Sequence, residues 1–154
     1  MDKGDFSEKI LTISNPQKLY LIDKWGTKRY SNEKRNFVEK RFLKEIREGK
    51  VIIITGNAVD ELKKIENNFL DWIYIDTSHI YEETLKELKM SELKIKKNGI
   101  ISWHDYCVGN VKKGCEYGVI QAVNEFCIEN NWELIFLTHE SHGFLSFAIR
   151  KIKA

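Results

Sequence analysis

Four side chains that can bind a metal or move a proton follow two short apolar runs of this sequence. Asp76 directly follows the first run, and His79 comes three residues later. His104 and Asp105 directly follow the second run. Carboxylates and imidazoles are common ligands of divalent metals. An imidazole, with an unperturbed pKa of about 6.5, also accepts a proton near neutral pH.

The segment around these residues predicts how they are positioned. The runs Trp72–Ile75 and Ile100–Trp103 are typical of buried strands, and between them Leu85, Leu88 and Leu93 recur at near-helical spacing. A strand, a helix and a second strand of this length form a βαβ unit, whose strands are parallel and whose crossover is right-handed. Both polar clusters should therefore emerge at the carboxyl edge of the sheet, where open α/β sheets bind ligands.

The rest of the chain predicts a doubly wound α/β sheet with one antiparallel strand at its end. Apolar and β-branched runs predict strands at Leu19–Ile22 and Val51–Ile54. Only about six residues separate the last two runs, Glu133–Leu137 and Phe144–Ile149, whereas a parallel crossover needs roughly a dozen. The last strand must therefore run antiparallel. Helices are expected over residues 5–13, from Ser31 to Gly49, after Asn57, and over 119–128.

One segment has no clear period. Val108–Gly118 contains three glycines, and we expect a mobile loop that acts as a lid over the carboxyl edge.

Length and composition limit the class of protein. The 154 residues suit one domain, and 42% hydrophobic with 31% charged residues is ordinary for a soluble globular protein. No apolar run approaches the roughly 20 residues of a membrane helix, and the first residues lack the apolar region of a signal peptide. Three cysteines without a C-x-x-C motif favour reduced thiols in a cytoplasm. We expect a cytoplasmic protein without a membrane partner.

Charge is nearly balanced over the whole chain. The net charge of +2 is too small to indicate a nucleic-acid partner. The segment Lys24–Lys50 has ten Lys or Arg against four Glu, which is typical of a solvated helix face. The sharper interpretation is that this segment attracts an anionic substrate.

Several short motifs are weak individually but fairly specific as an ordered set. The set resembles the class I S-adenosylmethionine-dependent methyltransferases. It is most similar to the small-molecule and sugar O-methyltransferase branch, with macrocin-type and cephalosporin-hydroxylase-like proteins. The resemblance implies a Rossmann-like, mostly parallel sheet. In it, the last strand runs antiparallel and inserts between two earlier strands of the chain, the Ile100 strand and the Glu133 strand. The motifs are Gly4-Asp5-Phe6-Ser7, Leu21-Ile22-Asp23-Lys24-Trp25, Gly56-Asn57, Ile75-Asp76 with His79 and Tyr81-Glu82, Asn98-Gly99 before His104-Asp105-Tyr106, and Gly118-Val119.

The resemblance also implies cofactor-binding residues, namely Gly4, Asp23, Trp25, Gly56 and Asn57. Asp23 ends a strand where a family carboxylate accepts hydrogen bonds from both ribose hydroxyls; its alternative role is a turn or helix-cap aspartate. Asn57 would lie near the adenine, and has an equally good structural role as a helix N-cap. Gly4 would be the remnant of the loop that holds the methionine part of the cofactor.

Asp76, His104 and Asp105 resemble the metal triad of the macrocin-type enzymes. Oxygen ligands suit Mg²⁺, and a histidine ligand shifts the preference toward Mn²⁺, Fe²⁺ or Zn²⁺. Such a metal would bind the oxygens of a vicinal diol and lower a hydroxyl pKa. His79 or Asp76 would act as the general base. The alternative is that Asp105 caps a turn and accepts a hydrogen bond from His104.

The sequence departs from the family pattern at its start, because the first strand and the leading glycine of the cofactor loop are absent. That strand would lie between the Leu19 and Trp72 strands, so unpaired strand edges are expected. A truncated gene start, a partner chain that fills the gap, or lost cofactor binding would each explain the departure.

The leading hypothesis is methyl transfer to an oxygen of a small acceptor, a sugar or sugar nucleotide, by a methyltransferase-like domain over residues 1–154. Two other classes stay open at this point. One is a catalytically silent methyltransferase-like module that pairs with a partner chain or a second copy. The other is a metal-dependent hydrolase that uses the four polar residues alone.

Overall fold

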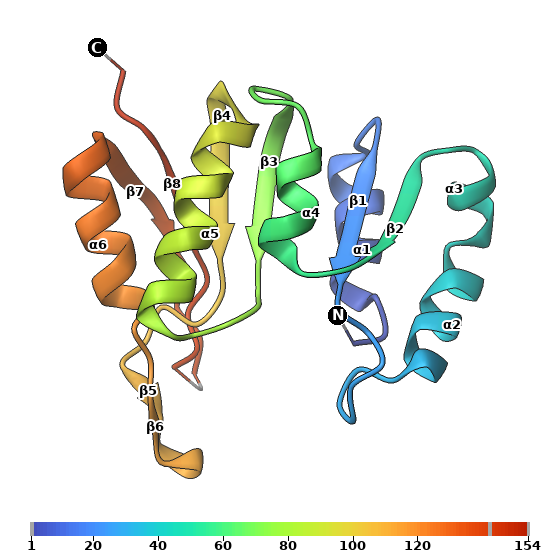
Figure 1. Cartoon of the computed structure of the whole chain (residues 1–154), viewed down its shortest axis with the longest axis horizontal. Helices are drawn as coiled ribbons and strands as arrows, with labels where there is room; N and C mark the ends of the chain where they lie inside the picture. The colour runs from blue at the N-terminus through green and yellow to red at the C-terminus, as the bar shows by residue number, and fades with distance from the viewer. Residues whose placement is uncertain (1, 142, 154) are drawn as a thin grey trace. The chain divides into compact units, whose positions relative to one another are not determined.

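A computed structural model describes residues 2–141 and 143–153 of the chain (Figure 1). The residues gather into two compact units, Met1–Glu61 and Leu62–Ala154. The expectation of a single methyltransferase-like domain stays a prediction. Within the described ranges, no helix is both long enough and apolar enough to cross a membrane.

The first unit is built on two parallel strands with helices around them. Strand β1 pairs with β2 in the register from Leu19 opposite Val51 to Asp23 opposite Thr55, so both predicted strands are confirmed. The helix expected from Ser31 to Gly49 is divided at Phe42, whose ring is buried in the core beside Trp25. The elements are α1 (Asp5–Lys9), the π-helix η1 (Ile10–Ser14), β1 (Leu19–Asp23), α2 (Asn32–Arg41), α3 (Leu43–Arg47), β2 (Val51–Thr55) and α4 (Ala58–Lys64), which runs into the second unit.

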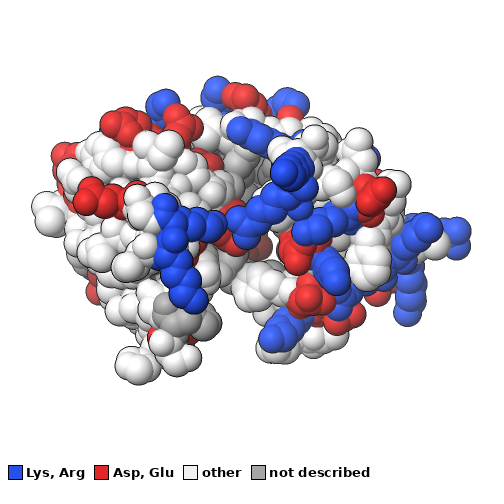
Figure 2. Space-filling model, turned by 90° about the horizontal axis from the view of Figure 1, so that it is seen from below, with Lys and Arg blue, Asp and Glu red and all other residues white. Residues whose placement is uncertain are grey.

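The basic segment Lys24–Lys50 is partly neutralised by acidic side chains. Arg41 pairs with the carboxylates of Asp5 at 2.5 Å and Glu8 at 2.7 Å. Lys34 pairs with Asp2, and Arg35 pairs with Glu39 on the same helix. Figure 2 shows Lys and Arg interspersed with Asp and Glu on one face of the molecule. These pairs favour the interpretation of a solvated, charged helix surface.

The second unit contains a four-stranded sheet in the order β3-β4-β8-β7 (Figure 1). Strands β3 and β4 are parallel, whereas β8 is antiparallel to both β4 and β7. The predicted antiparallel strand is therefore confirmed, as is its insertion between the Ile100 and Glu133 strands, although it begins at Phe147 rather than Phe144. The elements are β3 (Leu70–Ile75), α5 (Tyr81–Lys94), β4 (Ile95–Trp103), β5 (Gly109–Asn110), the 3₁₀-helix η2 (Val111–Lys113), β6 (Cys115–Glu116), α6 (Val119–Asn130), β7 (Trp132–Leu137) and β8 (Phe147–Lys151).

Helices α5 and α6 pack on one face of this sheet (Figure 1). Because side chains alternate across a strand, every second residue of the central strands enters the core. Helix α5 supplies Leu88, which is fully buried, but Leu93 is 52% exposed, unlike the stripe expected from the sequence. Leu93 lies five residues after Leu88, and five rotations of about 100° place its side chain away from the buried face of the helix. The core includes Ile73, Ile75, Leu88, Ile101, Trp103, Val123, Phe126, Phe147 and Ile149.

Strands β1 and β3 each have an unpaired edge. Among the described residues, β1 pairs only with β2, and β3 pairs only with β4. Unpaired edges at these two strands were expected from the sequence.

The segment Val108–Gly118, expected to be an irregular loop, instead forms a small antiparallel hairpin. Strand β5 pairs with β6 through Gly109 opposite Glu116 and Asn110 opposite Cys115. The Asn110 side chain accepts a hydrogen bond from the Lys113 N–H and so caps η2. Turn-capping side chains of this kind give no periodic signal in the sequence.

Truncation of Leu88 should destabilise the protein strongly. We expect Leu88→Ala to lower the free energy of unfolding by about 2–5 kcal/mol, because it leaves a cavity in the core of the second unit. Leu93→Ala on the same helix is the matched control and should change it by less than about 0.5 kcal/mol. Urea unfolding followed by circular dichroism measures both. Equal effects of the two variants would contradict the assignment of the buried face.

Candidate active site

Three of the predicted polar side chains meet at the carboxyl edge of β3 and β4. Asp76 follows β3, His79 lies in the connection to α5, and Asp105 follows β4. One ligand atom from each of the three lies within 4.8 Å of the others. The parallel pairing of β3 with β4, through Ile75 opposite Trp103, brings the two strand ends side by side. The βαβ argument from the sequence therefore identified the correct edge.

His79 and Asp105 form the closest polar contact of this cluster. The His79 Nε2 atom lies 2.5 Å from Asp105 Oδ2, and the Asp105 residue is only 7% exposed. Because an ionised carboxylate only accepts hydrogen bonds, Nε2 carries the proton and donates it. The neutral imidazole then has its lone pair on Nδ1, for which the described residues provide no hydrogen-bond donor. This arrangement makes Nδ1 the basic atom.

His104 lies on the other side of the same carboxylate. Its Nδ1 atom is 3.2 Å from Asp105 Oδ1, and its backbone N–H donates to the carbonyl of Ile75. It is not part of the three-residue cluster with Asp76, in which His79 takes the place that the sequence suggested for His104. The reason is that the His104 backbone continues the pairing of β4 with β3. The β3–α5 connection, by contrast, brings the His79 side chain to Asp105.

The connection that carries His79 is anchored at several points. Thr77 Oγ1 donates to the buried Glu87 carboxylate on α5 at 2.6 Å. The Gly118 N–H, at the start of α6, donates to the His79 carbonyl at 2.7 Å. Tyr81 donates to Glu125 and so joins α5 to α6. These bonds restrict the backbone on both sides of the imidazole.

An aromatic residue that the sequence did not single out lies against His79. The Tyr117 ring is stacked on the imidazole, with 4.3 Å between the ring centroids and 16° between the ring planes. Tyr117 follows β6 and directly precedes the Gly118-Val119 motif. That adjacency was the only signal available, because a single tyrosine in a segment without a period does not indicate a contact 38 residues away.

In the first unit, Asp23 and Gly56 lie together at the carboxyl ends of β1 and β2. The Gly56 N–H donates to the Asp23 carbonyl at 3.0 Å. The Asp23 carboxylate accepts from the Trp25 N–H at 3.2 Å, so it does organise the turn, as its structural alternative required.

Trp25 is more buried than a residue on an open binding surface. It is 4% exposed, packs in the core of the first unit, and adopts a left-handed backbone conformation with φ of 45°. Its indole Nε1 is buried and has no hydrogen-bond partner among the described residues. A buried donor without a partner is costly, so this atom suits contact with a bound acceptor group.

The other two predicted cofactor residues have structural roles. Asn57 Oδ1 accepts from the N–H groups of Val59 and Asp60, so it is the N-cap of α4. Gly4 is buried at the start of α1 with φ of 82°, and a Cβ there would collide with the ring of Phe42. Both observations explain the residue type without a ligand contact.

The cysteines belong neither to the cluster of Asp76, His79 and Asp105 nor to the group around Asp23 and Gly56. Burial raises the pKa of Cys127 to about 11, and it also raises the pKa of the Cys107 thiol. Cys115 is exposed in the hairpin, and all three thiols are free. At neutral pH, thiols with raised pKa values are poor nucleophiles and poor metal ligands.

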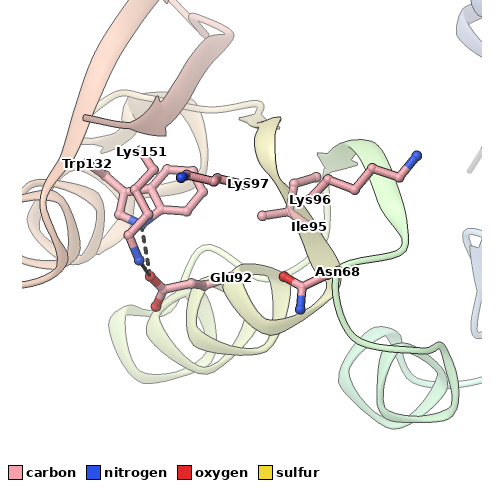
Figure 3. A pocket seen from close by; sticks show the side chains of 7 residues that line it. All are labelled: Asn68, Glu92, Ile95, Lys96, Lys97, Trp132 and Lys151. Carbon is pink, nitrogen blue, oxygen red and sulfur yellow. Dashed lines mark hydrogen bonds and ion pairs between the residues drawn. The ribbon is translucent and has the colours of Figure 1, made fainter. Parts of the chain in front are cut away.

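A hollow of about 370 Å³ in the second unit lies at the opposite edge of the sheet (Figure 3). It contains the first residues of β4 and β7 and none of the four polar residues above. Glu92 accepts hydrogen bonds from both Trp132 Nε1 and Lys151 Nζ there, so its carboxylate is paired within the protein. Its lining residues are Asn68, Glu92, Ile95, Lys96, Lys97, Trp132 and Lys151.

Comparisons with known proteins point to one family. A family model described as a methyltransferase domain matches residues 6–106, which is more than half of the chain. Among curated proteins, no sequence matches this chain significantly.

Several solved structures share the fold. A protein titled as a putative rRNA-methylase from Clostridium thermocellum superposes with a TM-score of 0.68 at 13% identity, covering 98% of this chain and 84% of that one. An O-methyltransferase from Bacillus cereus in complex with SAH gives 0.59 at 15% identity, covering 96% and 80%. A putative caffeoyl-CoA O-methyltransferase from Staphylococcus aureus gives 0.62 at 19% identity, covering 94% and 69%. At these identities the likeness shows the α/β, mostly parallel fold alone.

Proposed function

Because the chain belongs to the methyltransferase domain family, we propose that it transfers a methyl group from S-adenosylmethionine to an oxygen of a small acceptor. The family supports methylation with this cofactor in general. The choice of oxygen rests on the candidate base at the carboxyl edge of β3 and β4. A sugar or sugar nucleotide as acceptor rests on the sequence resemblance.

The observation that carries this proposal is the hydrogen bond between His79 Nε2 and Asp105 Oδ2. The bond fixes the tautomer, so Nδ1 is the atom that receives the hydroxyl proton of the acceptor. Asp105 then stabilises the imidazolium that forms, as the aspartate of a Ser-His-Asp triad does. Transfer would form a bond from this oxygen to the methyl carbon, break the carbon–sulfur bond and release S-adenosylhomocysteine, so alignment of the two reactants would supply much of the rate.

The first unit contains groups that fit the cofactor. S-adenosylmethionine, when bound, supplies an electrophilic methyl group. The Asp23 carboxylate would accept hydrogen bonds from the ribose hydroxyls, since it ends β1 at the carboxyl edge of its parallel pair with β2. The buried indole N–H of Trp25, which has no partner among the described residues, would be satisfied by an acceptor atom of the ligand.

A divalent metal is the alternative way to activate the acceptor. Asp76, His79 and Asp105 would hold it, because their ligand atoms lie within 4.8 Å of one another. Two carboxylates and one imidazole suit Mg²⁺ less well than Mn²⁺, because Mg²⁺ prefers oxygen ligands. In this case the metal would lower the hydroxyl pKa in place of the base.

Loss of the Asp23 charge should weaken cofactor binding. We expect Asp23→Asn to raise the Kd for S-adenosylhomocysteine about 10- to 100-fold, because a hydrogen bond to a charged group contributes about 1.5–3 kcal/mol. Isothermal titration calorimetry on the whole chain measures this. Asp60→Asn, which removes an exposed carboxylate of α4, is the control and should bind like the wild type. Equal affinities for wild type and Asp23→Asn, or no binding at millimolar ligand, would refute the proposed contact.

Loss of the base should slow transfer without weakening cofactor binding. We expect His79→Gln to lower kcat about 10²- to 10⁴-fold while the calorimetric Kd for S-adenosylhomocysteine stays unchanged. Formation of S-adenosylhomocysteine is followed with nucleoside diphosphate sugars and with catechol, a vicinal diol, as test acceptors. Wild-type protein that binds the cofactor but methylates none of them would favour the silent module.

Metal removal separates the two activation routes. If Nδ1 is the base, EDTA should leave kcat unchanged, and added Mn²⁺ should not restore His79→Gln. If a metal acts instead, EDTA should abolish activity and Asp76→Asn should raise the Mn²⁺ concentration needed for half-maximal rate. Asp71→Asn, an exposed carboxylate paired with Lys96, is the matched control for Asp76→Asn.

A further inference from the structure

The segment from Asp105 to Gly118, which contains the β5–β6 hairpin, contacts His79 at both of its ends. At its start, the Asp105 carboxylate binds His79 Nε2. At its end, the Tyr117 ring stacks on the imidazole, and the next residue, Gly118, donates its N–H to the His79 carbonyl. One short segment of chain therefore holds the ring edge, the ring face and the backbone of the same residue.

We propose that Tyr117 is a positioning residue that fixes the plane of the His79 imidazole, and that the β5–β6 hairpin exists to present it. A single hydrogen bond at Nε2 defines one direction but leaves the ring free to rock about that direction. A second ring at 4.3 Å and 16° removes this freedom, because offset stacking of aromatic rings has a preferred geometry. Catalytic groups need their rotamers locked by such packing.

Tyr117 is itself held by its own hairpin. Its N–H donates to the Val108 carbonyl at 3.1 Å. The opposite parts of the hairpin are not buried: Val108 is 78% exposed and Val111 is 95% exposed. Tyr117, by contrast, is partly buried and packs against the core of the second unit, so both the core and the hairpin support its ring.

Gly118 allows the stacking because it brings the chain close to the first turn of α5. A Cβ at position 118 would lie 2.5 Å from the backbone nitrogen of Tyr81, which no side chain could tolerate without a backbone shift. The absence of that atom permits the 2.7 Å bond from the Gly118 N–H to the His79 carbonyl. Tyr117, one residue earlier, is thereby placed over the imidazole.

Nuclear magnetic resonance of the histidine rings tests this positioning without any acceptor. In the wild type we expect the His79 ring protons, assigned with His79→Gln, to be shifted upfield by the Tyr117 ring current, with Nε2 as the protonated nitrogen. Tyr117→Phe retains a ring and should retain the shift. Tyr117→Leu should lose it and broaden the His79 ring signals, because the ring is then free to rock about the Nε2 bond to Asp105. Val111→Ala, at an exposed site of the same hairpin, is the control and should leave the His79 signals unchanged.

If Tyr117→Leu does not fold, Tyr117→Met, which keeps a long apolar side chain but has no ring, replaces it and should lose the shift in the same way. An unchanged His79 shift in Tyr117→Leu, or in Tyr117→Met where that variant replaces it, would overturn the inference.

Kinetics extends the test to the reaction, and this step rests on the proposed function. Tyr117→Leu should lower kcat about ten- to a hundredfold with an unchanged KM for S-adenosylmethionine, and Tyr117→Phe should restore the rate. Equal rates for Tyr117→Leu and wild type would overturn a positioning role in catalysis. The proposed function fails separately, when the wild type shows the expected His79 signals but methylates no test acceptor, because the ring shift does not depend on turnover.

Discussion

The polar edge of the second unit depends on the buried carboxylate of Asp105. A buried charge is costly unless it is paired and hydrogen-bonded. Here one oxygen accepts from His79 and the other lies 3.2 Å from a nitrogen of His104, so both oxygens have a partner. Asp105 adopts a left-handed conformation with φ of 65°, which aspartate tolerates better than most residues. That conformation ends β4 and turns its carboxylate toward the β3–α5 connection.

The sheet topology explains why such a cluster forms at this edge. Parallel β3 and β4 end side by side, and the antiparallel β8 lies on the other side of β4, with Phe147 opposite Trp103. The end of β4 is therefore supported by a strand on each side. The Tyr106 N–H donates to the Leu145 carbonyl just before β8, which extends this support beyond the last paired residue. A rigid strand end is what a base-orienting carboxylate requires.

The strand pattern could be predicted from the sequence because apolar runs and loop lengths are local properties. The short connection predicted between Leu137 and Phe144 indicated the antiparallel direction, and the ends at Asp23, Asp76 and Asp105 followed from the runs before them. The place of His79 and the stack with Tyr117 could not be predicted in this way. Both depend on the path of the β3–α5 connection and of the β5–β6 hairpin. Backbone hydrogen bonds, such as that from the Gly118 N–H to the His79 carbonyl, fix these paths and leave no periodic signal in the sequence.

The hydrogen bond at Nε2 also makes the two routes of acceptor activation compete. With its Nε2 proton directed at Asp105, His79 has one lone pair, on Nδ1. A metal bound by His79 in this tautomer would take that lone pair, and the imidazole could no longer accept a proton. A metal bound through Nε2 would instead displace the bond to Asp105, along with the control of the tautomer. The His79–Asp105 pair therefore serves either route but not both at once, because one lone pair cannot accept a proton and bind a metal together.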